Sequence, residues 1–189
     1  MLQHAELPTQ APSGRYRWAR PLAATVLVLT GIALLMLAKA WRGVEATLSA
    51  QAIAQITGQT TIASPSRHLL ILYKNSNVQS IFVLTGECSV AYLLATLFIC
   101  AGPLMLLRQL STVRTSIAIA VAMSVLILVN VARLTAIGAA VSAWGLDPGL
   151  EIAHTYFGSL LTVVGTCAAG VAFAVVLIGR RKARHPAVG

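Results

Sequence analysis

The chain has 189 residues, of which 57% are hydrophobic and 10% are charged. About a quarter of the residues in an ordinary soluble domain are charged, so this composition excludes that class and predicts an integral membrane protein. Fourteen lysine and arginine residues against five acidic residues give a net charge of +9. Because most of these cations flank apolar segments, we expect them to set orientation in a membrane, and we expect no nucleic-acid partner.

Four apolar segments are long enough to cross a bilayer, which takes about 20 residues of α-helix. They are residues 22–38, 90–107, 117–131 and 157–178. The third reaches full length only if it includes the polar residues Thr115 and Arg133 at its borders. We therefore expect an all-α integral membrane protein, a four-helix transmembrane bundle that forms a single membrane domain over residues 1–189.

Basic residues precede the first apolar segment, fill the turn between the second and third, and follow the fourth. They are Arg15, Arg17, Arg20, Arg108, Arg114, Arg180, Arg181, Lys182 and Arg184. By the positive-inside rule, residues 1–20 and 180–189 form cytoplasmic tails, and both termini are cytoplasmic. An alternative is that residues 1–40 are a signal peptide, since Ala38-Lys39-Ala40 fits a cleavage site. The apolar run is longer than the roughly 7 to 15 residues usual for such signals.

The segments on the outer side contain shorter elements. Residues 43–57 have a loosely helical rhythm, which is compatible with a helix along the outer surface or with a solvated connector. Two β-prone runs then flank Lys74-Asn75-Ser76-Asn77, which predicts a small extracytoplasmic β-hairpin. Residues 136–144 are expected to continue helically along the interface. Asp147, as an N-cap followed by Pro148, is expected to begin the last helix.

Three reactive side chains are predicted at one level of the membrane. Cys88 opens the second span, Arg133 closes the third, and His154 lies in the outer part of the fourth. A thiol attacks as its thiolate, which a helix N-terminus or a cation stabilises, and a histidine can take the thiol proton and return it to a leaving amine. The guanidinium can stabilise the thiolate or an oxyanion. The pattern indicates a cysteine acyl-transfer site, without a cofactor or a metal.

Each of these residues also has a purely structural interpretation. Cys88 can be a small buried hydrophobic residue, Arg133 a helix-end anchor, and His154 an interfacial histidine. Asn130, one turn before Arg133, either orients its guanidinium or makes a helix–helix hydrogen bond. Cys100 and Cys167 lie deep in apolar segments, and we expect both to be small buried hydrophobic residues.

The chain resembles the exosortase/archaeosortase family of membrane-embedded cysteine transpeptidases. The resemblance rests on Glu87-Cys88-Ser89 opening one span, Asn130-Val131-Ala132-Arg133 closing the next, and His154 with Gly158 beginning the last. It covers residues from about 65 to about 175 and implies Cys88, Arg133 and His154 as the catalytic residues. Ser89 and Asn130 are expected to support them. The family commonly has Cys-Ser-Gly, whereas this chain has Val90 in place of that glycine.

The resemblance implies a multi-pass enzyme of the cell membrane whose site faces outside. Its substrate would be an exported protein that ends in a recognition motif, a transmembrane helix and a basic tail. The enzyme would cut at the motif through a Cys88 thioester and pass the new C-terminus to a lipid or envelope acceptor. One alternative is a cysteine protease that transfers the acyl group to water. Another is a non-enzymatic membrane helper or transporter subunit that binds an anion through Arg133.

Overall fold

The structure is a computed structural model that describes residues 15–74, 76–108 and 110–179. Its α-helices are α1 (Arg15–Met36), α2 (Ala38–Thr57), α3 (Ala91–Leu107), α4 (Thr112–Trp144), α5 (Leu146–Glu151) and α6 (Ser159–Ile178). Its strands are β1 (Thr61–Ser64), β2 (Leu69–Lys74) and β3 (Asn77–Val83). A 3₁₀ turn, η1 (Gly86–Cys88), precedes α3, and a π-helix, η2 (Ile152–Gly158), joins α5 to α6.

Three helical stretches are long and apolar enough to cross a membrane. They are Trp18–Met36, Thr112–Trp144 and the continuous stretch Leu146–Ile178. The last two have 33 residues each, or about 50 Å at 1.5 Å per residue, so they exceed the ~30 Å hydrocarbon core. Helix α3 is equally apolar but has 17 residues, or about 26 Å. The described chain is therefore mostly helical, with three helices long and apolar enough to span a membrane and a shorter apolar helix.

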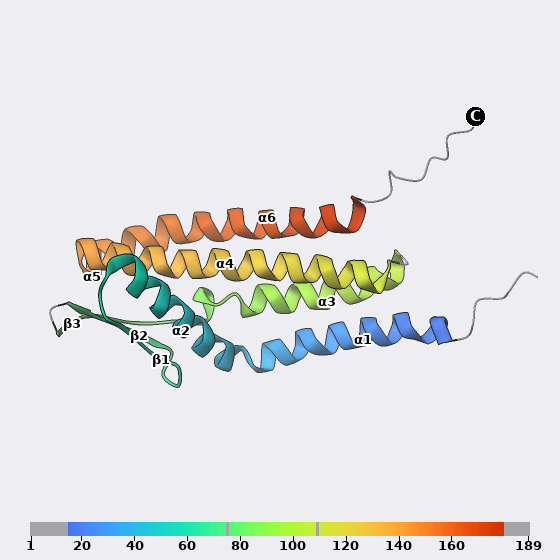
Figure 1. The fold of residues 1–189 in the computed structure, drawn as a ribbon, viewed down its shortest axis with the longest axis horizontal. Helices are drawn as coiled ribbons and strands as arrows, with labels where there is room; N and C mark the ends of the chain where they lie inside the picture. The colour runs from blue at the N-terminus through green and yellow to red at the C-terminus, as the bar shows by residue number, and fades with distance from the viewer. Residues whose placement is uncertain (1–14, 75, 109, 180–189) are drawn as a thin grey trace, which may run out of the picture.

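The long helices run side by side along the long axis of the molecule (Figure 1). Helix α1 packs mainly along α3, and α4 packs mainly along α6. Glycines allow the close approach, since a Cβ added to Gly31 of α1 would lie 2.6 Å from Ile99 Cγ1 of α3. A Cβ added to Gly165 of α6 would lie 2.4 Å from Val129 Cγ1 of α4. Small residues at such contacts are typical of membrane helix pairs. Helix α1 is therefore packed closely against α3 as part of the bundle.

Of the two alternatives left open for residues 43–57, the structure shows the helix, α2, which begins earlier, at Ala38. It ends at Gly58, which has a positive φ of 68° and donates its N–H to the Ala54 carbonyl, as a helix C-terminal glycine does. The helix packs against α4, where a Cβ added to Gly138 would lie 2.5 Å from Ile53 Cδ1. One face of α2 is therefore buried in the protein.

The small β-structure is a three-stranded antiparallel sheet in the order β1-β2-β3. The predicted hairpin is present, with Lys74 of β2 opposite Asn77 of β3, while Asn75 at its turn lies outside the described residues. The expectation of a hairpin alone was wrong because β1 pairs with β2 as a third strand. With four residues, β1 is too short to show a clear apolar alternation. Leu70 and Leu72 of β2 are fully buried beneath the sheet.

The prediction that residues 136–144 continue helically is confirmed, whereas the predicted start of the last helix is corrected. Residues 136–144 belong to the same helix as Arg133, because α4 runs without a break from Thr112 to Trp144. Asp147 is not the N-cap of the next helix. Gly145, with a φ of 87°, separates α4 from α5, which begins at Leu146 and holds Asp147 in its first turn. An acidic residue in a first turn still interacts favourably with the helix dipole.

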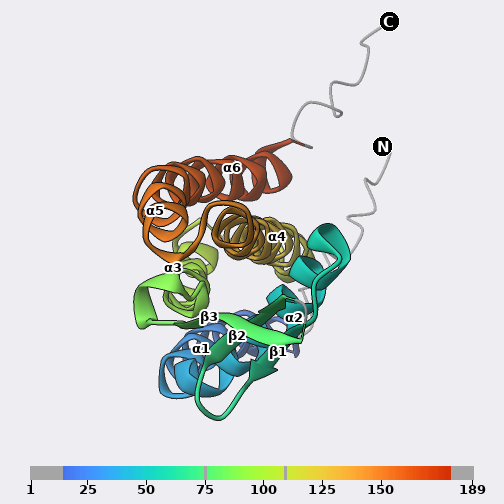
Figure 2. The ribbon, with the colours of Figure 1, turned by 90° about the vertical axis from the view of Figure 1, so that its left-hand side faces the viewer.

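The two ends of the bundle contain different secondary-structure elements. The sheet, α2 and α5 gather at one end, whereas the start of α1, the α3–α4 connection and the end of α6 lie at the other (Figures 1 and 2). The tails 1–14 and 180–189 lie outside the described residues. The connection holds Arg108, and Arg20 and Arg114 lie near the corresponding ends of α1 and α4. Arg20, Arg108 and Arg114 thus lie at one end of the bundle, whereas Lys39, Arg42, Arg67 and Lys74 belong to α2 and the sheet region at the other.

Candidate functional site

Cys88 lies on the 3₁₀ turn η1, between β3 and α3. Its N–H donates to the Thr85 carbonyl at 3.2 Å, and the N–H of Ser89 donates to the Gly86 carbonyl at 3.2 Å. The expectation that Cys88 opens the helix itself is corrected, because α3 begins three residues later, at Ala91. The Cys88 side chain is 7% exposed and belongs to the core cluster that contains Leu84 and Leu134.

The other two cysteines have different surroundings. Cys100 on α3 and Cys167 on α6 are exposed at the outer surface of the bundle, which contradicts the expectation that both are buried. Apolar helix positions in a membrane protein face either lipid or protein, and hydropathy alone does not distinguish them. Cys88 is thus the buried one of the three thiols.

The thiol of Cys88 lies beside the imidazole of His154. The Cys88 Sγ and His154 Nε2 atoms are 3.6 Å apart, within hydrogen-bond distance for sulfur, although 66 residues separate them in sequence. The Thr85 hydroxyl donates to the same sulfur at 3.6 Å. A thiol and an imidazole at this distance can exchange a proton, which is the first requirement of a cysteine nucleophile with a histidine base.

His154 is carried by the π-helix η2, which spans Ile152–Gly158 within the long helical stretch that ends at Ile178. Helical turns of this kind are rare and frequently occur at functional sites. Because periodicity arguments assume the α-helical repeat of 3.6 residues, the sequence does not indicate such a turn.

The Cys88–His154 pair opens onto a cavity of about 650 Å³. Its wall is mostly apolar and comes from β3, the loop before η1, α4 and α5. The lining residues are Ile81, Val83, Leu84, Thr85, Cys88, Leu134, Ile137, Leu146, Asp147, Leu150, Glu151, His154 and Thr155. Ligand sites in proteins commonly have volumes of roughly 300 to 1,000 Å³, so this cavity has room for a short peptide segment.

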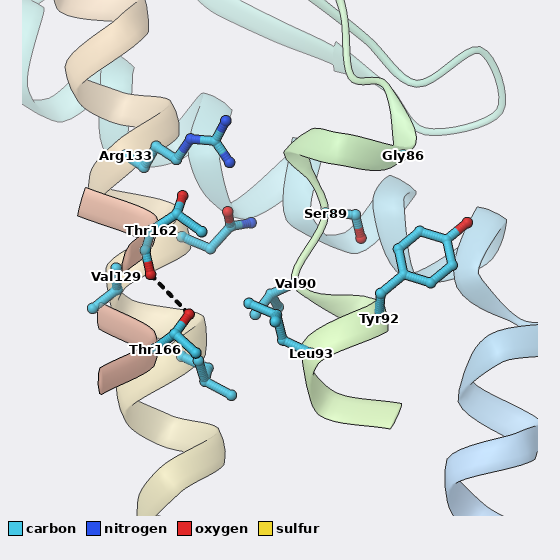
Figure 3. A pocket seen from close by; sticks show the side chains of 11 residues that line it. Gly86, Ser89, Val90, Tyr92, Leu93, Val129, Arg133, Thr162 and Thr166 are labelled. Carbon is cyan, nitrogen blue, oxygen red and sulfur yellow. Dashed lines mark hydrogen bonds between the residues drawn. The ribbon is translucent and has the colours of Figure 1, made fainter. Parts of the chain in front are cut away.

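Arg133 lines a second pocket, of about 230 Å³, whose wall includes Gly86 and Ser89 but not Cys88. The pocket lies between α3 on one side and α4 with α6 on the other (Figure 3). The Arg133 side chain is 8% exposed and extends toward the side of the pocket where Gly86 and Ser89 lie (Figure 3). The structure therefore brings Cys88 and His154 into contact and places Arg133 in the adjacent pocket.

Gly158 provides the space for the Arg133 side chain. A Cβ added to Gly158 would lie 3.0 Å from Arg133 Nε and 3.6 Å from Nη2. The guanidinium thus packs against the backbone at the end of η2, the π-helix that also carries His154. Gly158 has an ordinary helical φ of −64°, so the glycine is required here by space and not by backbone conformation.

The two supporting residues have structural partners. The Asn130 side-chain N–H donates to Glu45 Oε1 at 2.9 Å, so the helix–helix hydrogen bond is the alternative that the structure shows for this residue. The Ser89 hydroxyl accepts the N–H of Ala91 at 3.2 Å and caps α3. At the start of α3, the Val90 N–H thus donates to Glu45 and the Ala91 N–H donates to Ser89. The expected role of this helix N-terminus in stabilising the thiolate is not supported by these bonds.

Glu45 lies beside the candidate site, and the sequence analysis assigned it no role there. Its side chain is 3% exposed, and α2 is not among the candidate spans. Desolvation by burial raises the pKa of Glu45 above its ordinary value, and contacts with Ser89, the Val90 N–H, Trp41 and Asn130 oppose that rise. A sequence signal was present, because the neighbouring residues are those of a closely packed helix face: Gly43, Ala46, Ser49 and Ala50.

Among the described residues, no group of three or more His, Cys, Asp or Glu side chains is placed to hold a metal ion. Comparisons of the chain with protein-family models, with curated proteins and with solved structures found no match.

Proposed function

We propose that this chain is a membrane-embedded cysteine transpeptidase of the exosortase type, with Cys88 as nucleophile and His154 as general base and acid. The observation that carries the proposal is the 3.6 Å distance between Cys88 Sγ and His154 Nε2, at the wall of a cavity of about 650 Å³. A buried thiol without a base beside it would be an inert core residue. A cysteine paired with a histidine in a cavity has the parts that acyl transfer needs.

The proposed reaction has two acyl-transfer steps. His154 takes the Cys88 proton, and the thiolate attacks the carbonyl carbon of the scissile peptide bond. The C–N bond then breaks, the leaving amine takes the proton from His154, and a thioester joins Cys88 to the new C-terminus of the substrate. In the second step the acceptor gives a proton to His154 and attacks the thioester carbonyl. The S–C bond breaks and the proton returns to the Cys88 thiol.

Arg133 is proposed to stabilise the negative charge that develops in both steps. Its guanidinium is permanently charged, and charged side chains buried on candidate membrane spans, as Arg133 is, are rare and commonly mark functional sites. The pocket that it lines includes Gly86 and Ser89, the residues on either side of the Glu87-Cys88 dipeptide. A movement of the side chain from this pocket toward Cys88 on substrate binding would bring it to the oxyanion.

The proposed membrane arrangement is a four-helix bundle in which α3 is the fourth span. Helix α3 packs along α1, a candidate span, and the two run side by side (Figure 1). The basic segments at one end of the bundle assign that end, and both termini, to the cytoplasm. The sheet, α2 and the Cys88–His154 pair would then face outside. An exported protein anchored by one transmembrane helix would present its cleavage motif at that level.

The test is processing of an exported protein of the source organism that ends in a short motif, a transmembrane helix and a basic cluster. Cys88→Ala is expected to abolish processing while the protein remains inserted and abundant, because removal of a small side chain disturbs packing little. Cys100→Ala, at an exposed cysteine of the neighbouring helix, is the matched control and should process the substrate normally.

The mass of the processed substrate identifies the acceptor. A product whose mass exceeds that of the hydrolysed fragment by one acceptor molecule minus one water supports transpeptidation to a lipid or envelope group. A product with the mass of the hydrolysed fragment itself, which ends in a free carboxyl group, indicates a hydrolase. Processing that persists in the Cys88→Ala protein would overturn the covalent mechanism. Intact substrate with the unmodified enzyme would favour a non-enzymatic role in which Arg133 binds an anion.

A further inference from the structure

The carboxyl group of Glu45 connects three helices directly beside the candidate site. Among the side chains that the structure describes, it is the one buried carboxyl group, and it projects from α2. Its Oε1 atom accepts the N–H of Val90 at 2.9 Å and the side-chain N–H of Asn130 at 2.9 Å. One oxygen atom therefore links α2 to the start of α3 and to the middle of α4.

Both donors stand close to a site residue in sequence. Val90 follows Cys88 by two residues and is the N-cap of α3, and Asn130 precedes Arg133 by three residues on one face of α4. The N–H groups at a helix start have no partner within the helix. The N-cap residue Val90 makes no capping bond with its own side chain, so the start of α3 is bonded by Ser89, at the Ala91 N–H, and by Glu45 of a neighbouring helix, at the Val90 N–H. The position of the Cys88 turn relative to α4 thus depends on an atom of α2.

We infer that Glu45 is a positioning residue of the site, whose carboxyl oxygen holds the turn that carries Cys88 at a fixed distance from the α4 segment that carries Arg133. The effect on substrate processing rests on the proposed function, whereas the effect on the Cys88 thiol does not. The groups around the carboxyl are Trp41 on α2, Ser89 and the Val90 N–H before α3, and Asn130 on α4. None of these four groups changes charge near neutral pH. The titratable group is the carboxyl itself, whose pKa burial raises, and both Glu45→Ala and Glu45→Gln remove it, so comparison of these two variants separates the loss of its charge from the loss of the position that it holds.

The test uses Glu45→Ala, which removes the shared acceptor, and Glu45→Gln, which keeps an accepting oxygen in a side chain of the same shape. Ser49→Ala is the matched control, because Ser49 is fully buried one turn further along the same helix and its hydroxyl makes no hydrogen bond in the structure. Each variant is placed in a chain whose exposed cysteines are replaced (Cys100→Ala and Cys167→Ala), so that Cys88 is the remaining thiol.

The first readout is the pH profile of Cys88 alkylation by iodoacetamide in the purified full-length protein, without substrate and at a temperature where all variants are folded. In Glu45→Ala the turn is expected to move away from His154. The alkylation rate near neutral pH should then fall about tenfold, and the profile should shift to higher pH, since small displacements of reacting groups have effects of 10-fold to 100-fold. Glu45→Gln should keep the unmodified profile.

A merely structural role predicts a different result. In that case Glu45→Ala would lower the melting temperature, as Ser49→Ala also can, while the alkylation profile of the folded protein stayed unchanged. That outcome would overturn the inference, as would a Glu45→Gln profile that shifted as far as the alanine profile. If Glu45→Ala does not accumulate, Asn130→Ala replaces it, because this change removes the Asn130–Glu45 hydrogen bond and leaves the Val90–Glu45 bond in place. The same alkylation results then support or overturn the inference.

The second readout is processing of the tailed substrate, and it separates the two proposals. A shifted profile with about tenfold slower processing supports both. A shifted profile with no processing by any protein, the unmodified one included, supports the positioning role and contradicts the proposed function. Normal processing and a normal profile in Glu45→Ala contradict the positioning role while leaving the proposed function intact.

Discussion

The chemistry proposed for Cys88 depends on a contact between residues that are distant in the chain. The thiol meets His154 because η1 and η2 converge at the end of the bundle that holds the sheet, and the Thr85 hydroxyl donates to the same sulfur. A histidine base is most important where a thiol is least ionised. The contribution of His154 should therefore depend on pH in a way that a packing role would not.

His154→Ala is expected to slow substrate processing most at pH 6 to 7, and raising the pH should partly restore the rate. The reason is that an unassisted thiol has an ordinary pKa of about 8.5, so its thiolate becomes abundant without a base at higher pH. Rates of processing across this pH range provide the measurement. Tyr156→Ala, at an exposed residue of the same π-helix, is the control and should keep the unmodified profile. A uniform loss of rate at every pH in His154→Ala would contradict the role of a base.

At the scale of elements, the site depends on two irregular segments between regular helices. The turn η1 places Cys88 before α3 instead of in it, and η2 carries His154 and ends at Gly158, where the Arg133 side chain packs. The backbone at Gly158 is helical, so alanine fits its conformation but not its surroundings. This position therefore allows the location of the guanidinium to be tested without changing its charge.

Gly158→Ala is expected to displace the Arg133 side chain and to lower processing about tenfold in a protein that remains folded. The added methyl group would lie 3.0 Å from Arg133 Nε and 3.2 Å from the Ala153 carbonyl oxygen, closer than ordinary contacts allow. Gly170→Ala on α6 is the matched control, because a Cβ there meets no atom within 4 Å. Alanine is also the better helix former, so the control should be as stable as the unmodified protein or more stable. Equal activity of the two variants would show that the position of Arg133 does not limit the reaction.

The features that were predicted from the sequence are those set by local pattern. Apolar length predicted the long helices, and the asparagines around Ser76 predicted the hairpin between β2 and β3. The third strand was missed because β1 has only four residues, and the π-helix because periodicity arguments assume the α-helical repeat. The burial of Glu45 was missed because its partners, Val90 and Asn130, are distant in the chain. For the site, sequence order suggested that Cys88 and His154 share one level, and the structure brings them into contact. Asn130 was assigned two alternatives because its partner, on α2, could not be identified without the fold.

At the scale of the whole molecule, the basic residues determine the proposed orientation. Helix α3 is the segment on which the number of spans depends, because it is shorter than the three candidate spans. If it crosses the membrane, the β2–β3 hairpin and the α3–α4 connection lie on opposite sides. If it does not, they lie on the same side.

Labelling with a membrane-impermeant maleimide is expected to distinguish these topologies. In a chain without its native cysteines, Asn77→Cys should react in intact cells because the hairpin is proposed to face outside. Ser111→Cys, between α3 and α4, and Ala187→Cys, in the C-terminal tail, should react only after the membrane is permeabilised. Reaction of Ser111→Cys from outside would remove α3 as a span. Reaction of Asn77→Cys and Ala187→Cys alike in intact cells would contradict the four-helix topology.

The measurement that tests the central claim most directly is the intact mass of the enzyme while it processes the tailed substrate. The proposed mechanism predicts a covalent adduct on Cys88 whose mass equals that of the substrate up to the cleavage point. The adduct should be released by hydroxylamine, as thioesters are, and should be absent from the Cys88→Ala protein. A protein that processes the substrate fully in its Cys88→Ala form, or that carries its adduct on another residue, would contradict the claim that Cys88 is the nucleophile.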